Sequence, residues 1–438
     1  MNALTINRNK ELLIKHLSRP ESTGTKSAVL FVTLSNLSLI NNLFGYETGD
    51  SILKEVEHLF SHCLENASHV ARYGINDFVV IMDHLVSHEE AACLASQILA
   101  LLSHSSKKQR DFGLSAAIGI SIGPEHGDNP ALLIRHAATA MHRAKELGGR
   151  RFLFFHESMI GDAQEMILAD KIAHEALETN ALLLHYQPQF DLQTMDICGV
   201  EALLRLKEPC NVSIGGIVQA SEKSGAIIEI GHWVFNEACR QLAAWEEKKL
   251  GFRVAVNVSV SQLVHEAFLH QVDEVLLLHG VSPAQIEIEV TESQPVLQDC
   301  RCIATLAELR NRDFHITVDD FGSGYANLAA LCRLHVDKIK IDRSLFEGIP
   351  ESKESATVIR AIVQLCKEMG IRVLAEGVET KEQLEFIKAA GCDFVQGFYT
   401  GRPMTPDSVT DLLLLRKNLP KRSPFNAAPP VVDHAATS

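Results

Sequence analysis

Carboxylate, amide and amine side chains recur at the ends of a series of apolar, strand-like segments in the second part of the chain. In chain order they are Glu201, Arg205, Asn257, Glu289, Glu292, Asp319, Asp320, Lys340, Asp342, Glu376, Glu379 and Gln396. Oxygen ligands that include one amide and neither Cys nor His suit Mg²⁺ or Mn²⁺ better than zinc. Neighbouring carboxylates such as Asp319 and Asp320 can serve two metal ions about 3.5–4 Å apart. These residue types therefore indicate metal-assisted hydrolysis of a phosphate ester.

The segments that carry these side chains follow one another at regular intervals, and helical stretches separate most of them. The eight apolar runs cover residues 182–190, 198–206, 252–260, 286–293, 315–322, 337–343, 371–379 and 394–399. This alternation predicts a (β/α)8, TIM-like barrel over residues 181–415. Because the chemistry of such barrels lies at the C-terminal ends of the strands, we expect the polar side chains to meet at one mouth of the barrel.

Each of these residues also has an ordinary structural interpretation. A single Glu or Asp at a strand end is usually solvated or caps a helix. Lys340 and Asp342 can form an exposed ion pair, and Asn257 can lie in a turn. The recurrence of such residues around one predicted barrel mouth favours the metal site.

The first part of the chain follows a different pattern. Predicted strands cover residues 27–34, 68–74, 77–83, 114–121 and 151–155, and predicted helices cover residues 38–44, 50–64, 88–102 and 130–147. This alternation predicts an α/β domain over residues 27–155. We also expect an N-terminal helix (residues 9–17) and linker within residues 1–26, a connecting helix over residues 156–180 and a disordered tail over residues 416–438.

The composition is that of an ordinary globular protein, and 438 residues are enough for two or three domains. The formal net charge of −14 argues against a nucleic-acid polymer or an anionic membrane as partner. No apolar run reaches the roughly 18 residues of a membrane-spanning helix, and the N-terminus lacks the apolar core of a signal peptide. We therefore expect a cytoplasmic protein in which metal ions or local Arg and Lys attract a phosphate substrate.

The order of the motifs in the second part resembles that of the EAL domain family. The naming motif is Glu201-Ala202-Leu203-Leu204-Arg205. The further motifs are Tyr186-Gln187-Pro188, Asn257-Val258-Ser259, Glu289-Val290-Thr291-Glu292, Asp319 to Tyr325, Lys340-Ile341-Asp342, Ala375 to Glu379, and Gln396-Gly397-Phe398. The resemblance covers about residues 165–415. EAL domains are Mg²⁺- or Mn²⁺-dependent phosphodiesterases that open cyclic di-GMP to linear pGpG, so the resemblance implies that activity and two metal ions per domain.

The resemblance also assigns roles to individual residues. The metal ligands would be Glu201, Asn257, Glu289, Asp319, Asp320 and Glu376. The catalytic residues would be Glu201, Lys340 and Glu376, of which Lys340 holds a water or phosphate oxygen at the metals and Glu376 is a base for water. The substrate-contacting residues would be Gln187, Leu203, Arg205, Asp320, Glu379 and Gln396. Glu292 resembles the residue that braces the loop at Asp319 and Asp320.

The chain departs from the EAL pattern in the segment that follows Arg205. Leu206 stands where a Trp is usual, Glu208-Pro209 where a His-Pro pair is usual, and Ile217 where a Phe is usual. This segment contacts the dinucleotide in the family. We expect the changes to affect affinity more than chemistry, because the set of metal ligands is complete.

The first part of the chain resembles the GGDEF, or diguanylate cyclase, domain. The resemblance rests on Asn41, Gly45, Gly49-Asp50, Arg72 to Phe78 and Ala140 to Lys145. The naming motif reads Gly74-Ile75-Asn76-Asp77-Phe78 instead of Gly-Gly-Asp-Glu-Phe, and Thr33 stands where a metal-binding Asp is usual. The inhibitory Arg-x-x-Asp site would fall at Glu65 and Ser68 and is absent. We therefore expect no cyclase activity.

Two functions remain open for the whole chain. The first is a cyclic di-GMP phosphodiesterase whose first domain either packs or responds to GTP, with Lys145 available for a phosphate. The second is a catalytically inactive cyclic di-GMP receptor that signals through a protein partner. A bifunctional enzyme is disfavoured by Thr33, Ile75 and Asn76. EAL domains often pair through the barrel, which suggests a homodimer.

Overall fold

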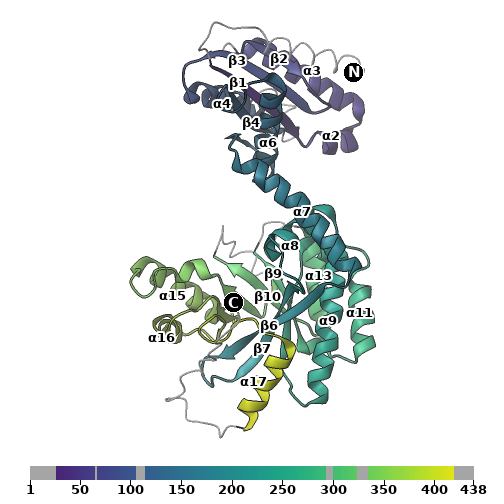
Figure 1. The fold of residues 1–438 in the computed structure, drawn as a ribbon, viewed down its shortest axis with the longest axis vertical. Coiled ribbons are helices and arrows are strands. Elements are labelled where there is room, and N and C mark those ends of the chain that lie inside the picture. The colour runs from purple at the N-terminus through teal and green to yellow at the C-terminus, as the bar shows by residue number, and fades with distance from the viewer. Residues whose placement is uncertain (1–25, 65–66, 105–113, 293–298, 323–333, 419–438) are drawn as a thin grey trace. The chain divides into compact units, whose positions relative to one another are not determined.

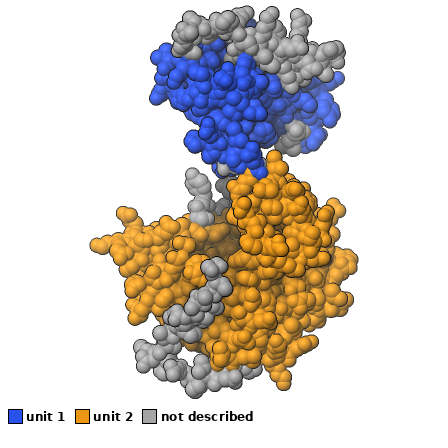
Figure 2. Space-filling model, in the orientation of Figure 1, with its two compact units in different colours: residues 1–164 blue, residues 165–438 orange. Residues whose placement is uncertain are grey.

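The computed structural model describes residues 26–64, 67–104, 114–292, 299–322 and 334–418 (Figure 1). The chain divides into two units, residues 1–164 and 165–438, which have different colours in Figure 2. The predicted N-terminal helix at residues 9–17 and the predicted tail beyond residue 418 lie outside the described residues. None of the described helices is both long and apolar enough to cross a membrane.

A five-stranded sheet forms the centre of the first unit. Its strands are β1 (Lys26–Ser35), β2 (His69–Arg72), β3 (Asp77–Leu85), β4 (Ser115–Gly123) and β5 (Arg151–Phe154), in the order β2-β3-β1-β4-β5. The helices around it are α2 (Leu37–Phe44), α3 (Tyr46–Cys63), α4 (His88–His104) and α6 (Pro130–Glu146). Each strand and helix predicted between residues 27 and 155 has a counterpart here, so the predicted α/β fold is confirmed.

Both faces of this sheet are covered, because successive side chains of a strand point to opposite faces. Leu30 and Val32 of β1 belong to one hydrophobic core, which also contains buried residues of α3 and α4. Val29 and Phe31 belong to a second core, together with Leu133 of α6. The continuous apolar run of β1 is therefore that of a strand buried on both sides.

The helix α7 (Ser158–Glu178) occupies most of the segment for which a connecting helix was predicted. It begins in the first unit and continues into the second. Its residues Ala169 and Ala173 are fully or almost fully buried in the core of the second unit. Small side chains at this spacing of four lie on one face of the helix and let it pack closely.

The second unit is a closed eight-stranded barrel. Its strands are β6 (Leu182–Asp191), β7 (Ile197–Leu206), β8 (Arg253–Asn257), β9 (Ile286–Thr291), β10 (His315–Phe321), β11 (Lys338–Ile341), β12 (Arg372–Ala375) and β13 (Phe394–Val395). They close in the order β10-β11-β12-β13-β6-β7-β8-β9. All eight predicted runs contribute a strand, so the predicted barrel is confirmed.

One strand of the barrel runs against the others, which a regular (β/α)8 alternation does not predict. β6 pairs antiparallel with both β7 and β13, whereas the other neighbouring strands are parallel. The reason is the length of the connection. Residues 192–196 alone join β6 to β7, and a parallel crossover needs a dozen or more residues.

Helices surround the barrel in Figure 1. They are α8 (Ile214–Ser224), α9 (Ile227–Glu247), α10 (Val260–Leu263), α11 (Phe268–His279), α13 (Cys300–Asn311), α15 (Lys353–Glu368), α16 (Lys381–Ala390) and α17 (Pro406–Asn418), with 3-10 turns η1 (Pro283–Gln285) and η2 (Arg343–Phe346). Because α17 continues to Asn418, residues 416–418 are helical, although the sequence assigned them to the disordered tail. The buried indole of Trp245 donates a hydrogen bond to Thr410 of α17, with a length of 2.8 Å.

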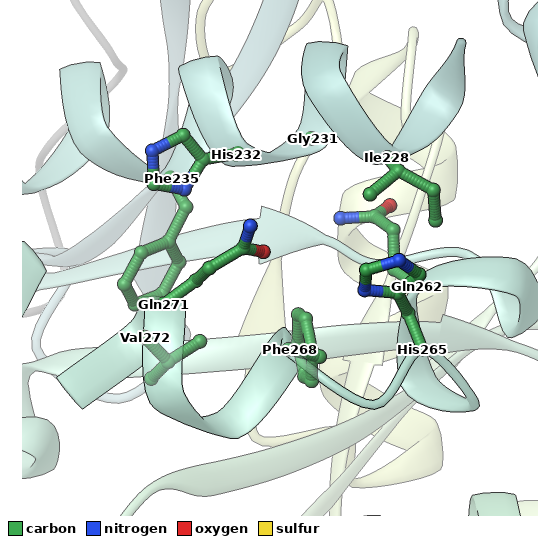
Figure 3. A pocket seen from close by; sticks show the side chains of 9 residues that line it. All are labelled: Ile228, Gly231, His232, Phe235, Gln262, His265, Phe268, Gln271 and Val272. Carbon is green, nitrogen blue, oxygen red and sulfur yellow. The ribbon is translucent and has the colours of Figure 1, made fainter. Parts of the chain in front are cut away.

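A small pocket between α9 and α11 shows how the segment after β8 is held in place (Figure 3). Gln262 of α10 accepts a hydrogen bond from the backbone of Ser259 and so caps this short helix. A Cβ atom added to Gly231 of α9 would lie 1.9 Å from the Gln262 amide nitrogen. Gly231 therefore leaves room for the side chain that fixes the chain just beyond Asn257. With a volume of about 10 Å³ the pocket has room for a single water.

Candidate active site

The ammonium group of Lys340 lies at the centre of the polar cluster in the barrel. Lys340 is on β11, and its side chain is 1% exposed. Four carboxylates surround its Nζ atom: those of Glu376 at 2.6 Å, Glu289 at 2.9 Å, Asp319 at 3.1 Å and Glu201 at 3.3 Å. These residues come from β7, β9, β10 and the end of β12. The polar residues predicted at different strand ends are thus brought together.

Two amide side chains orient the carboxylate of Glu201. Gln396 donates a hydrogen bond to Glu201 Oε2 over 2.6 Å, and Asn257 donates one to Glu201 Oε1 over 2.8 Å. Gln396 also donates to Gln187 on β6, at 3.1 Å. Gln187 in turn donates to the backbone carbonyl of Gly401. Both oxygens of Glu201 are therefore fixed by partners from strands on either side of β7.

A second polar layer lies two residues further down the same strands. Lys338 Nζ is 2.5 Å from Glu287 and donates to Gln189 over 3.0 Å. Thr317 donates to Glu287 over 2.7 Å. All four side chains are buried. Because side chains of a strand alternate, Glu287, Thr317 and Lys338 point inward like Glu289, Asp319 and Lys340. The lower layer is electrically neutral, whereas the upper one is not.

The carboxylates of the upper layer outnumber its cations. Four carboxylates face one ammonium group, which leaves three negative charges when all are ionised. Oxygen atoms of Glu201, Glu289 and Asp319 lie within 4.8 Å of one another, and so do those of Asp319, Asp320 and Glu376. The Oε1 atom of Glu289 is buried without a hydrogen-bond partner among the described residues. These two overlapping sets of ligands fit two divalent cations that share Asp319.

The protonation of the cluster reflects this imbalance. Burial raises the pKa of Glu376 to about 8, although the neighbouring Lys340 ammonium group acts in the opposite direction. Burial and the neighbouring carboxylates raise the pKa of Glu289 as well. Burial alone would lower the pKa of Lys340, but the surrounding carboxylates, Glu201 first, raise it well above the usual value. Lys340 is therefore a fixed positive charge, while part of the carboxylate set holds protons at neutral pH when no metal is bound.

The turn after Asp319 is held in an uncommon conformation. Asp320 has a φ of 55°, in the left-handed region, and its backbone N–H donates to Asp319 Oδ1 over 2.8 Å. Glu292 accepts a hydrogen bond from the backbone of Gly322 over 2.9 Å, and its own N–H donates to the carbonyl of Asp319. Burial, followed by the charge of Asp319, raises the pKa of Asp320 to about 6. Residues 323–333, which include Gly324 of the Gly-containing segment, lie outside the described residues.

The cluster opens into a cavity of about 270 Å³. It is lined by Gln187, Glu201, Asp319, Arg343, Glu376, Gly377, Glu379, Gln396, Gly397 and Phe398. The sequence-predicted residues Gln187, Glu379 and Gln396 are thus at its wall. Leu203, Arg205 and Asp320, which were also predicted to contact substrate, are not among the lining residues. Arg205 instead donates to the backbone carbonyl of Leu204 over 2.7 Å.

The ordinary structural interpretation holds for Asp342 but not for Lys340 or Asn257. Lys340 is buried among carboxylates and makes no exposed ion pair with Asp342. The carboxylate of Asp342 caps η2 by accepting a hydrogen bond from the backbone of Ser344, at 3.0 Å. Asn257 contributes its side-chain amide to Glu201 rather than only turning the chain.

Four lining residues did not emerge from the sequence as site residues: Arg343, Gly377, Gly397 and Phe398. Arg343 pairs with Glu379 at 3.0 Å, and Phe398 is 46% exposed with the Arg402 guanidinium 4.1 Å from its ring centre. Arg343, Gly377 and Gly397 each directly follow a recognised strand-end residue, and Phe398 lies one residue further on. Inspecting the two residues that follow each strand-end carboxylate or amide would have found them.

In the first unit, the hairpin between β2 and β3 is tied to Arg72. This buried side chain donates to the carbonyls of Gly74 at 3.1 Å and Ile75 at 2.6 Å. Ile75 itself is 72% exposed. The side-chain oxygen of Asn41 is buried without a hydrogen-bond partner in the described part of the chain, and it lies against Gly49.

The raised pKa of Glu376 leads to a testable pH dependence of stability. The folded protein holds this proton up to about pH 8, whereas an unfolded Glu loses it near 4.5. The free energy of unfolding of the metal-free protein should therefore fall as the pH rises from about 5 to about 8. Glu376→Gln should reduce this slope. Both Trp residues, Trp233 and Trp245, lie in the second unit, so their fluorescence during urea unfolding in EDTA reports on the barrel alone.

The matched control is Glu385→Gln, because Glu385 is exposed and pairs only with Lys381 of its own helix among the described residues. Its slope should equal that of the wild type. A wild-type barrel whose stability rises over this pH range, or a Glu376→Gln slope equal to that of the wild type, would contradict the burial of an uncompensated carboxyl group.

Comparison with known proteins assigns both parts of the chain. The EAL domain profile matches residues 170–403, and the profile of the diguanylate cyclase GGDEF domain matches residues 6–151. A bifunctional diguanylate cyclase/cyclic di-GMP phosphodiesterase of Pseudomonas aeruginosa, MucR, is 34% identical over 87% of this chain and 56% of its own length. The cyclic di-GMP phosphodiesterase PdeR of Escherichia coli is 32% identical over 91% of this chain and 60% of its own length.

The solved structure of the PaMucR phosphodiesterase in complex with c-di-GMP is 36% identical over 55% of this chain and 99% of that chain, with a TM-score of 0.53. The chain spans little more than half the length of the two curated relatives. The EAL profile alone covers more than half of the chain. The protein therefore belongs to the EAL domain family, as a tandem protein in which a GGDEF domain precedes the EAL domain.

Proposed function

We propose that the barrel hydrolyses cyclic di-GMP to linear pGpG with two bound Mg²⁺ or Mn²⁺ ions. The observation that carries this proposal is the excess of carboxylates around Lys340 at the base of an open cavity. A cluster with this net charge is costly to bury unless cations compensate it. The cyclic di-GMP phosphodiesterase activity of the relatives PdeR and MucR, and the bound c-di-GMP in the PaMucR structure, support the choice of substrate.

The residues that would hold the ions are Glu201, Asn257, Glu289, Asp319, Asp320 and Glu376. Two ions would lower the pKa of the attacking water and neutralise charge that develops on the phosphate. Gln396 and Asn257 keep both oxygens of Glu201 in a fixed orientation, so that this ligand needs no rearrangement. Lys340 supplies a permanent positive charge within reach of a phosphate oxygen.

Glu376 is the proposed base. Its carboxylate reaches Lys340 at 2.6 Å and lines the cavity, so it can face both the cluster and a bound substrate. As the water oxygen bonds to phosphorus, its proton passes to Glu376. The bond from phosphorus to the 3′ oxygen then breaks, the 3′ oxygen takes up a proton from solvent to become a hydroxyl group, and the ring of the dinucleotide opens.

For the first unit we propose regulation by GTP without cyclase activity. The enclosed, unpartnered oxygen of Asn41 is an acceptor for a donor such as the amide or amino group of a guanine base. The exposed Ile75 stands where the family has a glycine that lets the hairpin approach the nucleotide. Thr33 removes a carboxylate ligand that turnover would need. These residues therefore support binding of GTP by the first unit without its conversion to cyclic di-GMP.

The alternative is a receptor that binds cyclic di-GMP without hydrolysing it and signals through a protein partner or a homodimer. The residues that favour it are those after the naming motif. Arg205 turns its guanidinium to the Leu204 carbonyl, and the segment from Leu206 to Ile217 differs from the family pattern. These differences concern the binding of the substrate rather than the metal ligands, which is why hydrolysis is preferred.

Glu201→Gln should abolish hydrolysis while the protein stays folded. The substitution keeps the shape of the side chain but removes the charge that a metal ligand needs, so kcat should fall at least about 100-fold. The measurement is chromatographic detection of pGpG from cyclic di-GMP with Mg²⁺ or Mn²⁺. Glu385→Gln, on the exposed face of α16, should retain full activity. Tight binding of cyclic di-GMP without any turnover by the wild type would establish the receptor instead.

GTP should change the rate of pGpG formation, and no cyclic di-GMP should form from GTP. Asn41→Ala should remove the effect of GTP, because it deletes the enclosed acceptor. Asn42→Ala, at the neighbouring exposed position, should preserve it. Rates measured with and without GTP test this directly. Synthesis of cyclic di-GMP would contradict the loss of cyclase activity, and a rate that is independent of GTP would leave the first unit without a nucleotide-dependent role.

A further inference from the structure

Arg343 is the only cationic side chain among the described residues that line the cavity. The other charged lining residues are Glu201, Asp319, Glu376 and Glu379. A cyclic dinucleotide carries two phosphodiesters and therefore two negative charges. The carboxylate cluster with its cations can receive one of them. The second phosphodiester must lie against a wall that is otherwise acidic or neutral, and this would be unfavourable without a nearby cation.

The side chain of Arg343 is held at this wall by the backbone beneath it. Gly377 has a φ of 65°, and a Cβ atom there would lie 2.6 Å from Arg343 Cβ, 2.7 Å from Cγ and 3.0 Å from Cδ. The aliphatic part of Arg343 therefore packs directly on Gly377, between Glu376 and Glu379. The first residue of η2 is Arg343 itself, and the cap from Asp342 fixes its backbone. The guanidinium is thus attached to a rigid part of the barrel mouth.

The guanidinium still has donors to offer. Its Nη1 atom lies 3.0 Å from Glu379 Oε1, and Glu379 is its only ion-pair partner among the described residues. The side chain of Arg343 is 59% exposed. An Arg side chain has five N–H donors in a planar fork that matches two oxygens of a phosphate. The pair with Glu379 can therefore orient the fork while its remaining donors face a ligand.

We propose that Arg343 binds the phosphodiester that is not hydrolysed, and that Glu379 orients its guanidinium. The inference rests on the proposed hydrolysis of a cyclic dinucleotide and assigns a specificity-determining residue to it. It explains how a chain with a net charge of −14 accepts a dianion at a site rich in carboxylates. An exposed ion pair of purely structural value would contribute little to stability and nothing to substrate binding.

The test is the effect of Arg343→Gln on two substrates of the full-length chain. For cyclic di-GMP the KM should rise about tenfold or more, as for loss of a hydrogen bond to a charged group, with kcat changed less than about threefold. For bis(p-nitrophenyl) phosphate, which has a single phosphodiester, kcat/KM should stay unchanged. Arg343→Lys should recover part of the affinity because it restores the charge without the fork.

The control is Arg360→Gln on α15, whose guanidinium stacks on Phe386 at 5.3 Å and does not line the cavity. It should leave both substrates unaffected. An unchanged KM for cyclic di-GMP in Arg343→Gln, or an equal loss of kcat/KM with both substrates, would overturn the proposal.

If the wild type does not turn over cyclic di-GMP, the proposed hydrolysis is refuted, and a binding measurement is needed to test Arg343. The affinity for cyclic di-GMP, measured by calorimetry in the presence of Ca²⁺, then tests the role of Arg343 independently of hydrolysis. Binding by Arg343→Gln that is about tenfold weaker than that of the wild type supports this role, and equal binding refutes it.

Discussion

A buried ammonium group among four carboxylates is the interaction on which the architecture of the barrel depends. Lys340 can remain charged in the interior only because carboxylates from three other strands and the end of a fourth segment converge on it. That convergence needs a closed barrel, since no open sheet brings β7, β9, β10 and β11 around one point. The lower layer of Glu287 and Lys338 is neutral, so it supports the upper layer without adding to its negative charge.

The same imbalance connects the structure to the proposed chemistry. A cluster that one lysine cannot neutralise has a high affinity for further cations, and it holds protons when they are missing. The amides of Asn257 and Gln396 fix Glu201 without changing the charge. Substrate then meets a wall whose electrostatics depend on a few residues, and Arg343 is the one positive group there among those described. In the proposed function, binding and chemistry would thus be separated between the mouth and the floor of the cavity.

Much of this arrangement could be predicted from the sequence, because it depends on local patterns. Apolar runs with period-two alternation and polar ends predict strands, and a barrel places those ends together. The direction of β6 was missed, although the five residues that join it to β7 exclude a parallel crossover. The position of Arg343 at the cavity wall was missed for another reason. The direction of a long, flexible side chain depends on tertiary packing, such as the space above Gly377, which no spacing rule encodes.

The central claim is that the carboxylates around Lys340 form a site for two divalent ions. X-ray diffraction at the manganese absorption edge, from crystals of the full chain grown with Mn²⁺, tests it most directly. The account predicts two anomalous peaks about 3.5–4 Å apart, one beside Glu201, Glu289 and Asp319 and the other beside Asp319, Asp320 and Glu376. Crystals in Mn²⁺ that show no peak at this cluster, with Lys340 still contacting all four carboxylates, would contradict it.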